Sequence, residues 1–84
     1  MALVRTNVEC SSEHESLGTV ADFDACRQAC EETDGCMFFS FGEDDKACAY
    51  EKTSSAACPE GFIDKNKYNF YSLNLDDDIG RVTF

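Results

Sequence analysis

The sequence has few basic residues, one proline and no long run of apolar residues. Seven lysines and arginines stand against seventeen acidic residues, which gives a formal net charge of -10. This balance argues against nucleic-acid binding, which depends on basic side chains that neutralise phosphates, and against anionic membrane surfaces. No apolar stretch is long enough for a membrane-spanning helix. Seven phenylalanines and three tyrosines with a single proline are typical of a folded chain, not of a disordered one.

Six cysteines stand out in a chain of 84 residues, which has room for one small domain with a thin core. An even number of cysteines in so short a chain favours three disulfides over free thiols. Structural zinc is the competing interpretation, but its usual C-x2-C pairs are missing and His14 is the one histidine. We therefore expect disulfides, no metal, and an extracellular or secreted location or an oxidising organelle lumen.

The first residues do not resemble an export signal. Residues 1–7 contain no apolar stretch long enough for a signal peptide. Because disulfides require an oxidising compartment, we expect a mature or excised segment in which Met1 is either added or internal to a longer polypeptide. No N-glycosylation sequon is present, which is neutral about location.

One helix is predicted after the first cysteine. Asp22 suits an N-cap, and Phe23, Cys26 and Cys30 then fall on one apolar stripe of a helix. Gly35 follows this stripe and suits the left-handed exit of a helix. The two cysteines lie about one turn apart, so both are expected to point toward a sheet.

The apolar pattern also predicts four strands. They cover residues 3–10, 36–41, 47–52 and 68–73. The polar residues 42–46 join the middle two strands into a β-hairpin. Residues 11–16 and 53–61 are polar or small and are expected to form loops.

A helical Cys-x3-Cys, a Gly-Cys exit, an aromatic strand and a cysteine on the returning strand occur together in Ala25–Cys30, Asp34–Phe41 and Ala47–Tyr50. With Ser16–Gly18 and the closing Tyr68–Tyr71, this combination resembles the PAN/Apple domain family. The resemblance implies an α+β fold in which one helix packs on a curled antiparallel sheet. It places the domain at residues 8–73, with an N-terminal extension at 1–7 and an extended C-terminal tail at 74–84.

The resemblance also implies a disulfide pairing. By position in the family pattern, Cys26 pairs with Cys48 and Cys30 pairs with Cys36, and Cys10 and Cys58 remain as the third pair. Spacing alone does not choose among the many pairings that six cysteines allow. Cys58 departs from the family pattern because it precedes the last strand.

Catalysis and metal binding have little support in the sequence. His14 stands in a polar segment with no nucleophile signature around it. The acidic runs Asp44–Asp45 and Asp76–Asp78 lack the spacing of a calcium-binding loop and are typical of solvated turns. We therefore expect no enzymatic activity and no cofactor.

The aromatic strand offers the candidate binding residues. Strand alternation places Phe39 and Phe41 on one face of the sheet and Phe38 on the other. Phenylalanines on both faces mean either that the sheet is covered on both faces or that one apolar face is exposed. One helix covers only one face, so we expect a partner to pack on the other. The resemblance implies a binding module for a protein partner, with carbohydrate as the second ligand class. The alternative is a small disulfide-stapled subunit that is docked permanently on a larger extracellular or lumenal assembly.

The C-terminal tail adds two further candidates. Leu75, Ile79, Val82 and Phe84 give it apolar side chains, while Asp76–Asp78 keep one segment in water. Such a tail is too short and too acidic to fold by itself. We expect Val82 and Phe84 to be anchored in a contact with another chain.

Overall fold

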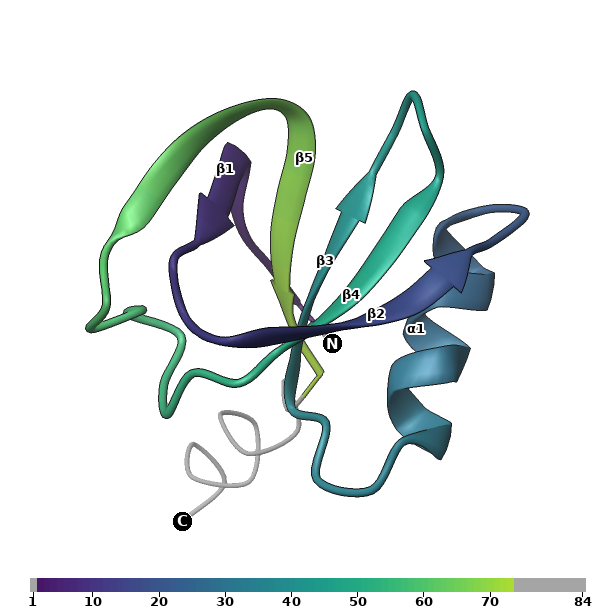
Figure 1. Ribbon diagram of the computed structural model, residues 1–84, viewed down its shortest axis with the longest axis horizontal. Coiled ribbons are helices and arrows are strands. Elements are labelled where there is room, and N and C mark those ends of the chain that lie inside the picture. Colours follow the sequence, from purple (N-terminus) through teal and green to yellow (C-terminus); the bar gives the residue numbers. More distant parts are fainter. Residues whose placement is uncertain (1, 74–84) are drawn as a thin grey trace, which may run out of the picture.

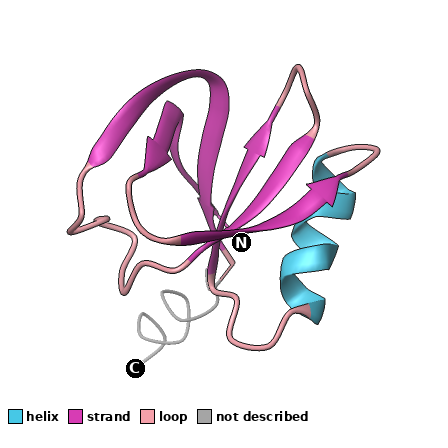
Figure 2. Cartoon of the chain, in the orientation of Figure 1, coloured by secondary structure: helices cyan, strands magenta, loops and turns pink. Residues whose placement is uncertain are grey.

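The computed structural model describes residues 2–73 as one helix and a five-stranded antiparallel sheet (Figures 1 and 2). The elements are β1 (Ala2–Cys10), β2 (His14–Thr19), α1 (Phe23–Glu32), β3 (Phe38–Gly42), β4 (Ala47–Glu51) and β5 (Phe62–Ser72). The strand order β1-β5-β3-β4-β2 places β1 and β2 at opposite edges. The expected α+β fold is confirmed, but the expected curl is wrong: the edge strands do not pair with each other, and the open sheet is not strongly curled.

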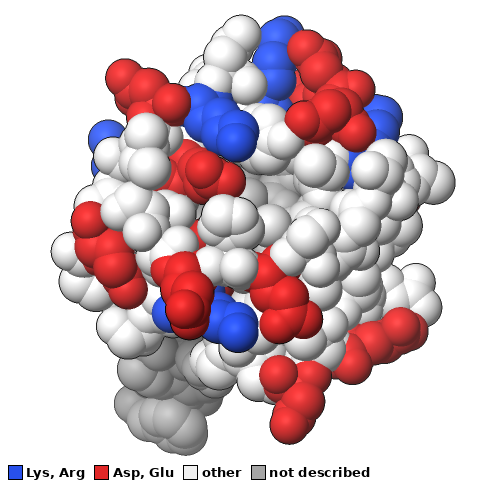
Figure 3. All heavy atoms as spheres, in the orientation of Figure 1, with Lys and Arg blue, Asp and Glu red and all other residues white. Residues whose placement is uncertain are grey.

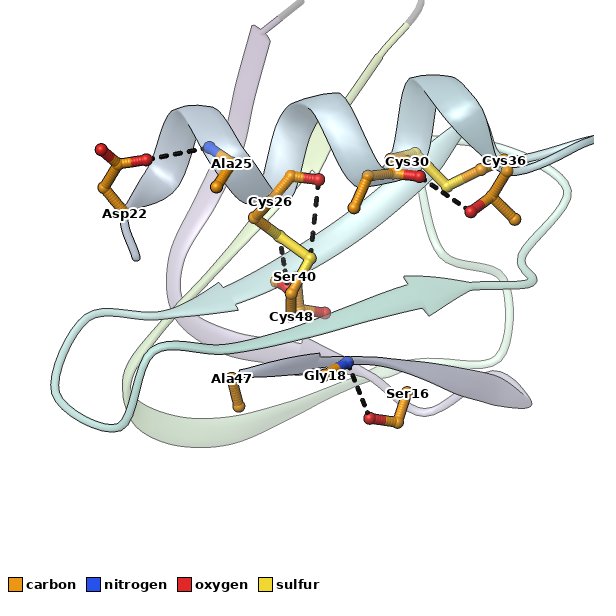
Figure 4. Close-up of a disulfide and its surroundings, with 12 residues drawn as sticks. Ser16, Gly18, Asp22, Ala25, Cys26, Cys30, Cys36, Ser40, Ala47 and Cys48 are labelled. Atoms are coloured by element: carbon orange, nitrogen blue, oxygen red, sulfur yellow. Dashed lines mark hydrogen bonds between the residues drawn. A yellow bond between two sulfur atoms is a disulfide. The ribbon is translucent and has the colours of Figure 1, made fainter. Parts of the chain in front are cut away.

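Helix α1 begins where the sequence predicts. Asp22 is its N-cap, and its Oδ1 accepts a hydrogen bond of 2.9 Å from the backbone N–H of Ala25 (Figure 4). This bond satisfies one of the N–H groups that the first turn of a helix leaves without a partner. Cys26 and Cys30 are the buried residues of the helix, so its apolar stripe faces the sheet as expected. At its end the backbone N–H of Thr33 donates to the carbonyl of Cys30.

Three disulfides join the helix and the loops to the sheet. They are Cys26–Cys48, Cys30–Cys36 and Cys10–Cys58, the same three pairs that the family resemblance implies. The first joins α1 to β4, and the second joins α1 to the segment before β3 (Figure 4). The third joins the end of β1 to the loop before β5.

The predicted loop at residues 11–16 is wrong in its second half, because residues 14–16 form the first part of strand β2. This strand pairs with β4 from His14 opposite Glu51 to Thr19 opposite Ala47. Its residues are exposed except for the half-buried Leu17, so this edge strand carries no alternating apolar pattern. The register shifts beside Gly18, whose φ is 94° and whose backbone N–H donates to Oγ of Ser16 at 3.1 Å (Figure 4).

Strands β1 and β5 pair from one end of β1 to the other, with register shifts between Leu3 and Arg5 and between Thr6 and Val8. The pairing runs from Ala2 opposite Ser72 to Cys10 opposite Phe62, so residues 2–7 take part in the sheet. The predicted domain boundary at residue 8 leaves residues 1–7 as an N-terminal extension. Figure 1 shows β5 as a long arc around β1. The first half of β5 is largely polar and exposed, so it carries no apolar pattern that predicts a strand.

Two buried clusters lie on the two faces of the sheet. The cluster under α1 contains Cys26, Cys30, Cys36, Phe39, Phe41 and Cys48. The second cluster contains Val8, Cys10, Phe38, Cys58 and Phe70. Each cluster includes at least one disulfide, which fits a chain whose small size limits its apolar core.

Candidate functional site

The two phenylalanines proposed as binding residues lie in the core beneath α1. Phe39 is 0% exposed and Phe41 is 4% exposed. The ring of Phe23 lies 5.9 Å from that of Phe39 and 6.1 Å from that of Phe41, measured between centroids. Neither side chain therefore reaches the surface. The other two proposed residues, Val82 and Phe84, lie outside the described residues.

The opposite face of the sheet is covered by the chain itself. Phe38 is 8% exposed, and its ring stacks on that of Phe70 at 5.9 Å. Phe62 meets Phe70 edge to face at 5.5 Å, and the Cys10–Cys58 disulfide belongs to the same cluster. This arrangement corrects the expectation that a partner packs on this face. The sequence did not show that a long first half of β5 would return over it.

An apolar row crosses the helix side of the sheet from β3 to β1. Phe39 is opposite Tyr71, and Tyr71 is opposite Leu3, so all three side chains point to one face. Their exposure increases outward: Phe39 is fully buried, Tyr71 is half-buried and Leu3 is 52% exposed. Helix α1 packs mainly on β3, β4 and β2 (Figure 1). The outer end of the row, at Leu3, is exposed.

Leu73 follows the last residue of β5 and extends this apolar row. Its backbone N–H donates to the carbonyl of Met37 at 2.8 Å, and its half-buried side chain packs against the cluster under α1. We refer to Leu3, Tyr71 and Leu73 as the outer apolar surface. The ring of Phe23, 4.6 Å from that of Tyr71, borders this surface on the helix side. Sequence reasoning did not identify Leu3 as a site residue; the alternation in residues 3–10 was the available signal, but it does not reveal the strand partner.

A buried carboxyl lies where β3, β4 and the segment before β2 meet. Glu51 is 0% exposed and accepts hydrogen bonds from the hydroxyls of Ser40 at 2.5 Å and Ser12 at 3.1 Å. Burial raises the pKa of Glu51 above its ordinary value, although both serine hydrogen bonds act in the opposite direction. Because a substrate has no access to this carboxyl, the cluster supports the fold and does not form an open catalytic arrangement.

A second polar group joins β5 to the turn between β3 and β4. The hydroxyl of Tyr68 donates to Oδ2 of Asp45 at 2.5 Å, which raises the pKa of Tyr68 to about 12 and lowers the pKa of Asp45. The ammonium of Lys65 lies 4.5 Å from the centroid of the Tyr68 ring. Acidic and basic side chains stand next to each other at the top of the view in Figure 3. This end of the sheet therefore presents both signs of charge.

Potential metal ligands come together once within residues 2–73. Cys10, Cys58 and Glu60 have ligand atoms within 4.8 Å of one another. The two sulfurs form a disulfide, so this group does not offer the thiolates that bind metals. Of the acidic runs, Asp45 is already hydrogen-bonded to Tyr68, and Asp76–Asp78 lie outside the described residues. No helix in the described part of the chain is long and apolar enough to cross a membrane.

Comparison with known proteins gives one result. The family model of the PAN domain matches residues 3–75. The matched range includes all six cysteines and the whole of helix α1. No significant match is found among curated proteins, and none among solved structures.

Proposed function

This chain belongs to the PAN domain family, and on that premise we propose that it is a non-enzymatic binding module that contacts a protein partner outside the cytosol. PAN domains are generally modules that bind proteins or carbohydrates, and they are typically not catalytic. Three disulfides in a PAN domain fit an oxidising, extracellular-type environment, either secreted or in an organelle lumen. Carbohydrate is the second ligand class.

The exposure of Leu3 within an apolar row is the observation that carries this proposal. A single exposed leucine is ordinary on a protein surface, but contiguous exposed apolar residues mark interaction sites. Leu3 is continuous with Tyr71 and Leu73 on one face of the sheet. Burying a fully exposed leucine is worth about 1.5–3 kcal/mol. Because Leu3 is 52% exposed, a partner that covers it gains about half of that free energy.

The non-enzymatic part of the proposal is supported by the surroundings of the titratable groups. His14 is exposed on the edge strand β2. The carboxyl of Glu51 is enclosed between two serine hydroxyls. Neither residue is joined to a nucleophile in an arrangement that a substrate could enter.

The test uses the full chain with its disulfides oxidised. We expect a soluble monomer in sedimentation velocity that binds one identified extracellular or lumenal protein reversibly, with a saturable isotherm in titration calorimetry. A chain that is insoluble alone and soluble only when co-expressed with a larger assembly would instead support the structural-subunit alternative. Turnover of a substrate that is lost when a named side chain is replaced would overturn the proposal.

A further inference from the structure

Two equally exposed apolar side chains on β1 and β5 have different surroundings. Leu3 is 52% exposed and Ile63 is 51% exposed. Leu3 lies opposite Tyr71 in the apolar row, whereas Ile63 lies opposite Glu9, whose carboxylate is 3.7 Å from the ammonium of Lys65. Ile63 is therefore an isolated apolar residue among charges, and Leu3 is the edge of an apolar surface. The chain thus contains a binding candidate and its own matched control.

Two acidic residues flank Phe23, which borders the outer apolar surface on the helix side. Phe23, whose ring contacts Tyr71, is preceded by Asp22 and followed by Asp24, and both acids are exposed. The carboxylate of Asp24 is 80% exposed. Its pair with Arg27, at 3.7 Å, leaves most of it in water.

Arg27 is the one basic residue of α1, and its guanidinium pairs with the carboxylates of Asp24 and Glu31. Two other basic side chains point elsewhere. The guanidinium of Arg5 on β1 lies 4.9 Å from the centroid of the Phe62 ring, which belongs to the second cluster on the opposite face. The ammonium of Lys46 lies 5.9 Å from the centroid of Phe41, nearer the turn between β3 and β4 than the end of β5. Residues 22–32 carry four acidic side chains and one basic one, so the helix side of the outer apolar surface has a net negative charge.

We propose that the outer apolar surface binds a protein segment that combines apolar side chains with lysine or arginine. This inference rests on the proposed function and adds the chemistry of the partner to it. The apolar side chains of the segment cover Leu3, Tyr71 and Leu73, and its cations face Asp22 and Asp24. Complementary charge of this kind increases the association rate and selects against other partners.

Charge also decides against two other occupants. Residues 74–84 of this chain follow Leu73 directly, but they carry Asp76–Asp78, which would be brought toward Asp22 and Asp24. A second copy of the chain would bring a formal charge of -10 toward an equal charge. Like charges at close range oppose both contacts, and a cationic segment gains from the same field.

The experiment selects peptides on the immobilised, oxidised full chain from a display library of random 12-residue peptides. We expect enriched sequences in which apolar residues stand beside lysine or arginine. Leu3→Ser should weaken their binding by about three- to tenfold, because about half of the free energy of burying a leucine remains to be gained when a partner covers Leu3. Ile63→Ser should change it less than twofold. The near-UV circular dichroism of both variants should match that of the unchanged chain.

Two further measurements test the charge of the partner. Asp24→Asn should weaken binding by about threefold, the range measured for exposed ion pairs, whereas Glu13→Gln at the opposite edge should leave it unchanged. Raising the sodium chloride concentration should also weaken peptide binding to the unchanged chain, because salt screens exposed charges.

Several results would overturn the inference. Basic peptides that bind the Leu3→Ser variant as tightly as the unchanged chain would show attraction to net charge alone. Enriched peptides that are acidic, or no enrichment at all, would contradict the proposed partner. Tighter peptide binding in Phe84→Asp would identify the tail as the occupant, and a dimer that Leu3→Ser dissociates would identify a second copy. An identified protein partner whose affinity Leu3→Ser leaves unchanged would overturn this inference while the binding-module function stands.

Discussion

The hydroxyl of Ser40 donates a hydrogen bond of 2.5 Å to Oε2 of Glu51, and both side chains are fully buried between neighbouring strands. The other carboxylate oxygen accepts from Ser12, which lies in the segment that leads into β2. The charged groups around this carboxyl are Glu9, which raises its pKa, and His14, which lowers it. No cation forms a direct ion pair with Glu51 among the described residues, so burial dominates.

We predict that Glu51→Gln increases the free energy of unfolding at neutral pH. The pKa of Glu51 is raised in the folded chain above its ordinary value of 4.5, so folding favours the protonated carboxyl. This stabilisation is complete below about pH 4.5 and is lost as the pH rises through the raised pKa. Urea unfolding between pH 4 and 8 should therefore show a loss of stability in the unchanged chain that Glu51→Gln reduces. The same loss in Glu51→Gln and in the exposed control Glu13→Gln would contradict the prediction.

We predict that Tyr68→Phe raises the pKa of Asp45 toward its ordinary value of 3.8. The Tyr68 hydroxyl is the largest cause of the lowered pKa, followed by the backbone N–H of Ala47, which remains in the variant. A carboxyl whose pKa is lowered by folding stabilises the fold at pH values above its ordinary pKa. This stabilisation by Asp45 is lost as the pH falls through the lowered pKa. Carboxyl NMR titration measures the change directly. A titration curve of Asp45 that is the same in both chains would refute the assignment.

We predict that removing the disulfides destabilises the chain in order of the loops they close. The cysteines of the three bridges are separated by 6, 22 and 48 residues. Loop entropy alone gives costs of about 2, 3 and 4 kcal/mol for Cys30–Cys36, Cys26–Cys48 and Cys10–Cys58, respectively. Each cost is a large part of the free energy of unfolding of a typical domain, which is about 5–15 kcal/mol. Paired cysteine-to-serine variants, measured by thermal unfolding, test the order.

Reduction of the unchanged chain is the companion measurement. A reductant should unfold it or remove its near-UV circular dichroism. A fully reduced chain that kept its dichroism and its melting temperature would show that the fold does not depend on the disulfides. The inferred oxidising compartment would then lose its support.

The sequence-based expectation that Val82 and Phe84 contact another chain stays a prediction. A photo-crosslinking amino acid at position 84 should give a covalent product with a second polypeptide in the native mixture. The same amino acid at position 13, an exposed site before β2, provides the control. A product found only within one chain, or equal products at both positions, would rule out the predicted contact.

Local signals in the sequence predicted the helix, the hairpin of β3 and β4, and the end of β5. Asp22 and the stripe of Phe23, Cys26 and Cys30 are sufficient for the helix because cap and periodicity agree. The pattern failed where a strand is exposed on both faces, as in β2, because alternation arises only when one face is buried.

The outer apolar surface could be predicted only in part. Leu3 stands in a segment that the pattern identifies as a strand, but its exposure depends on which strand lies beside it and where the helix ends. Both are set by the pairing of Leu3 with Tyr71, sixty-eight positions away. The burial of Phe38 depends in the same way on Phe70 and Phe62. Such contacts are properties of the whole sheet.

The pairing of Ala2 with Ser72 has a mechanical consequence. When these two residues are pulled apart, the load separates the hydrogen bonds between β1 and β5 one after another, as a zip opens, and not all at once as in shear. Separation of β1 stops at Cys10, where the bridge to Cys58 carries the tension across the chain. Residues 11–57, with the helix and the other two bridges, are then excluded from the force path. Strand β5 stays in the force path, so its pairing with β3 is loaded next, and the backbone of residues 11–57 comes under tension only after the bridge is reduced.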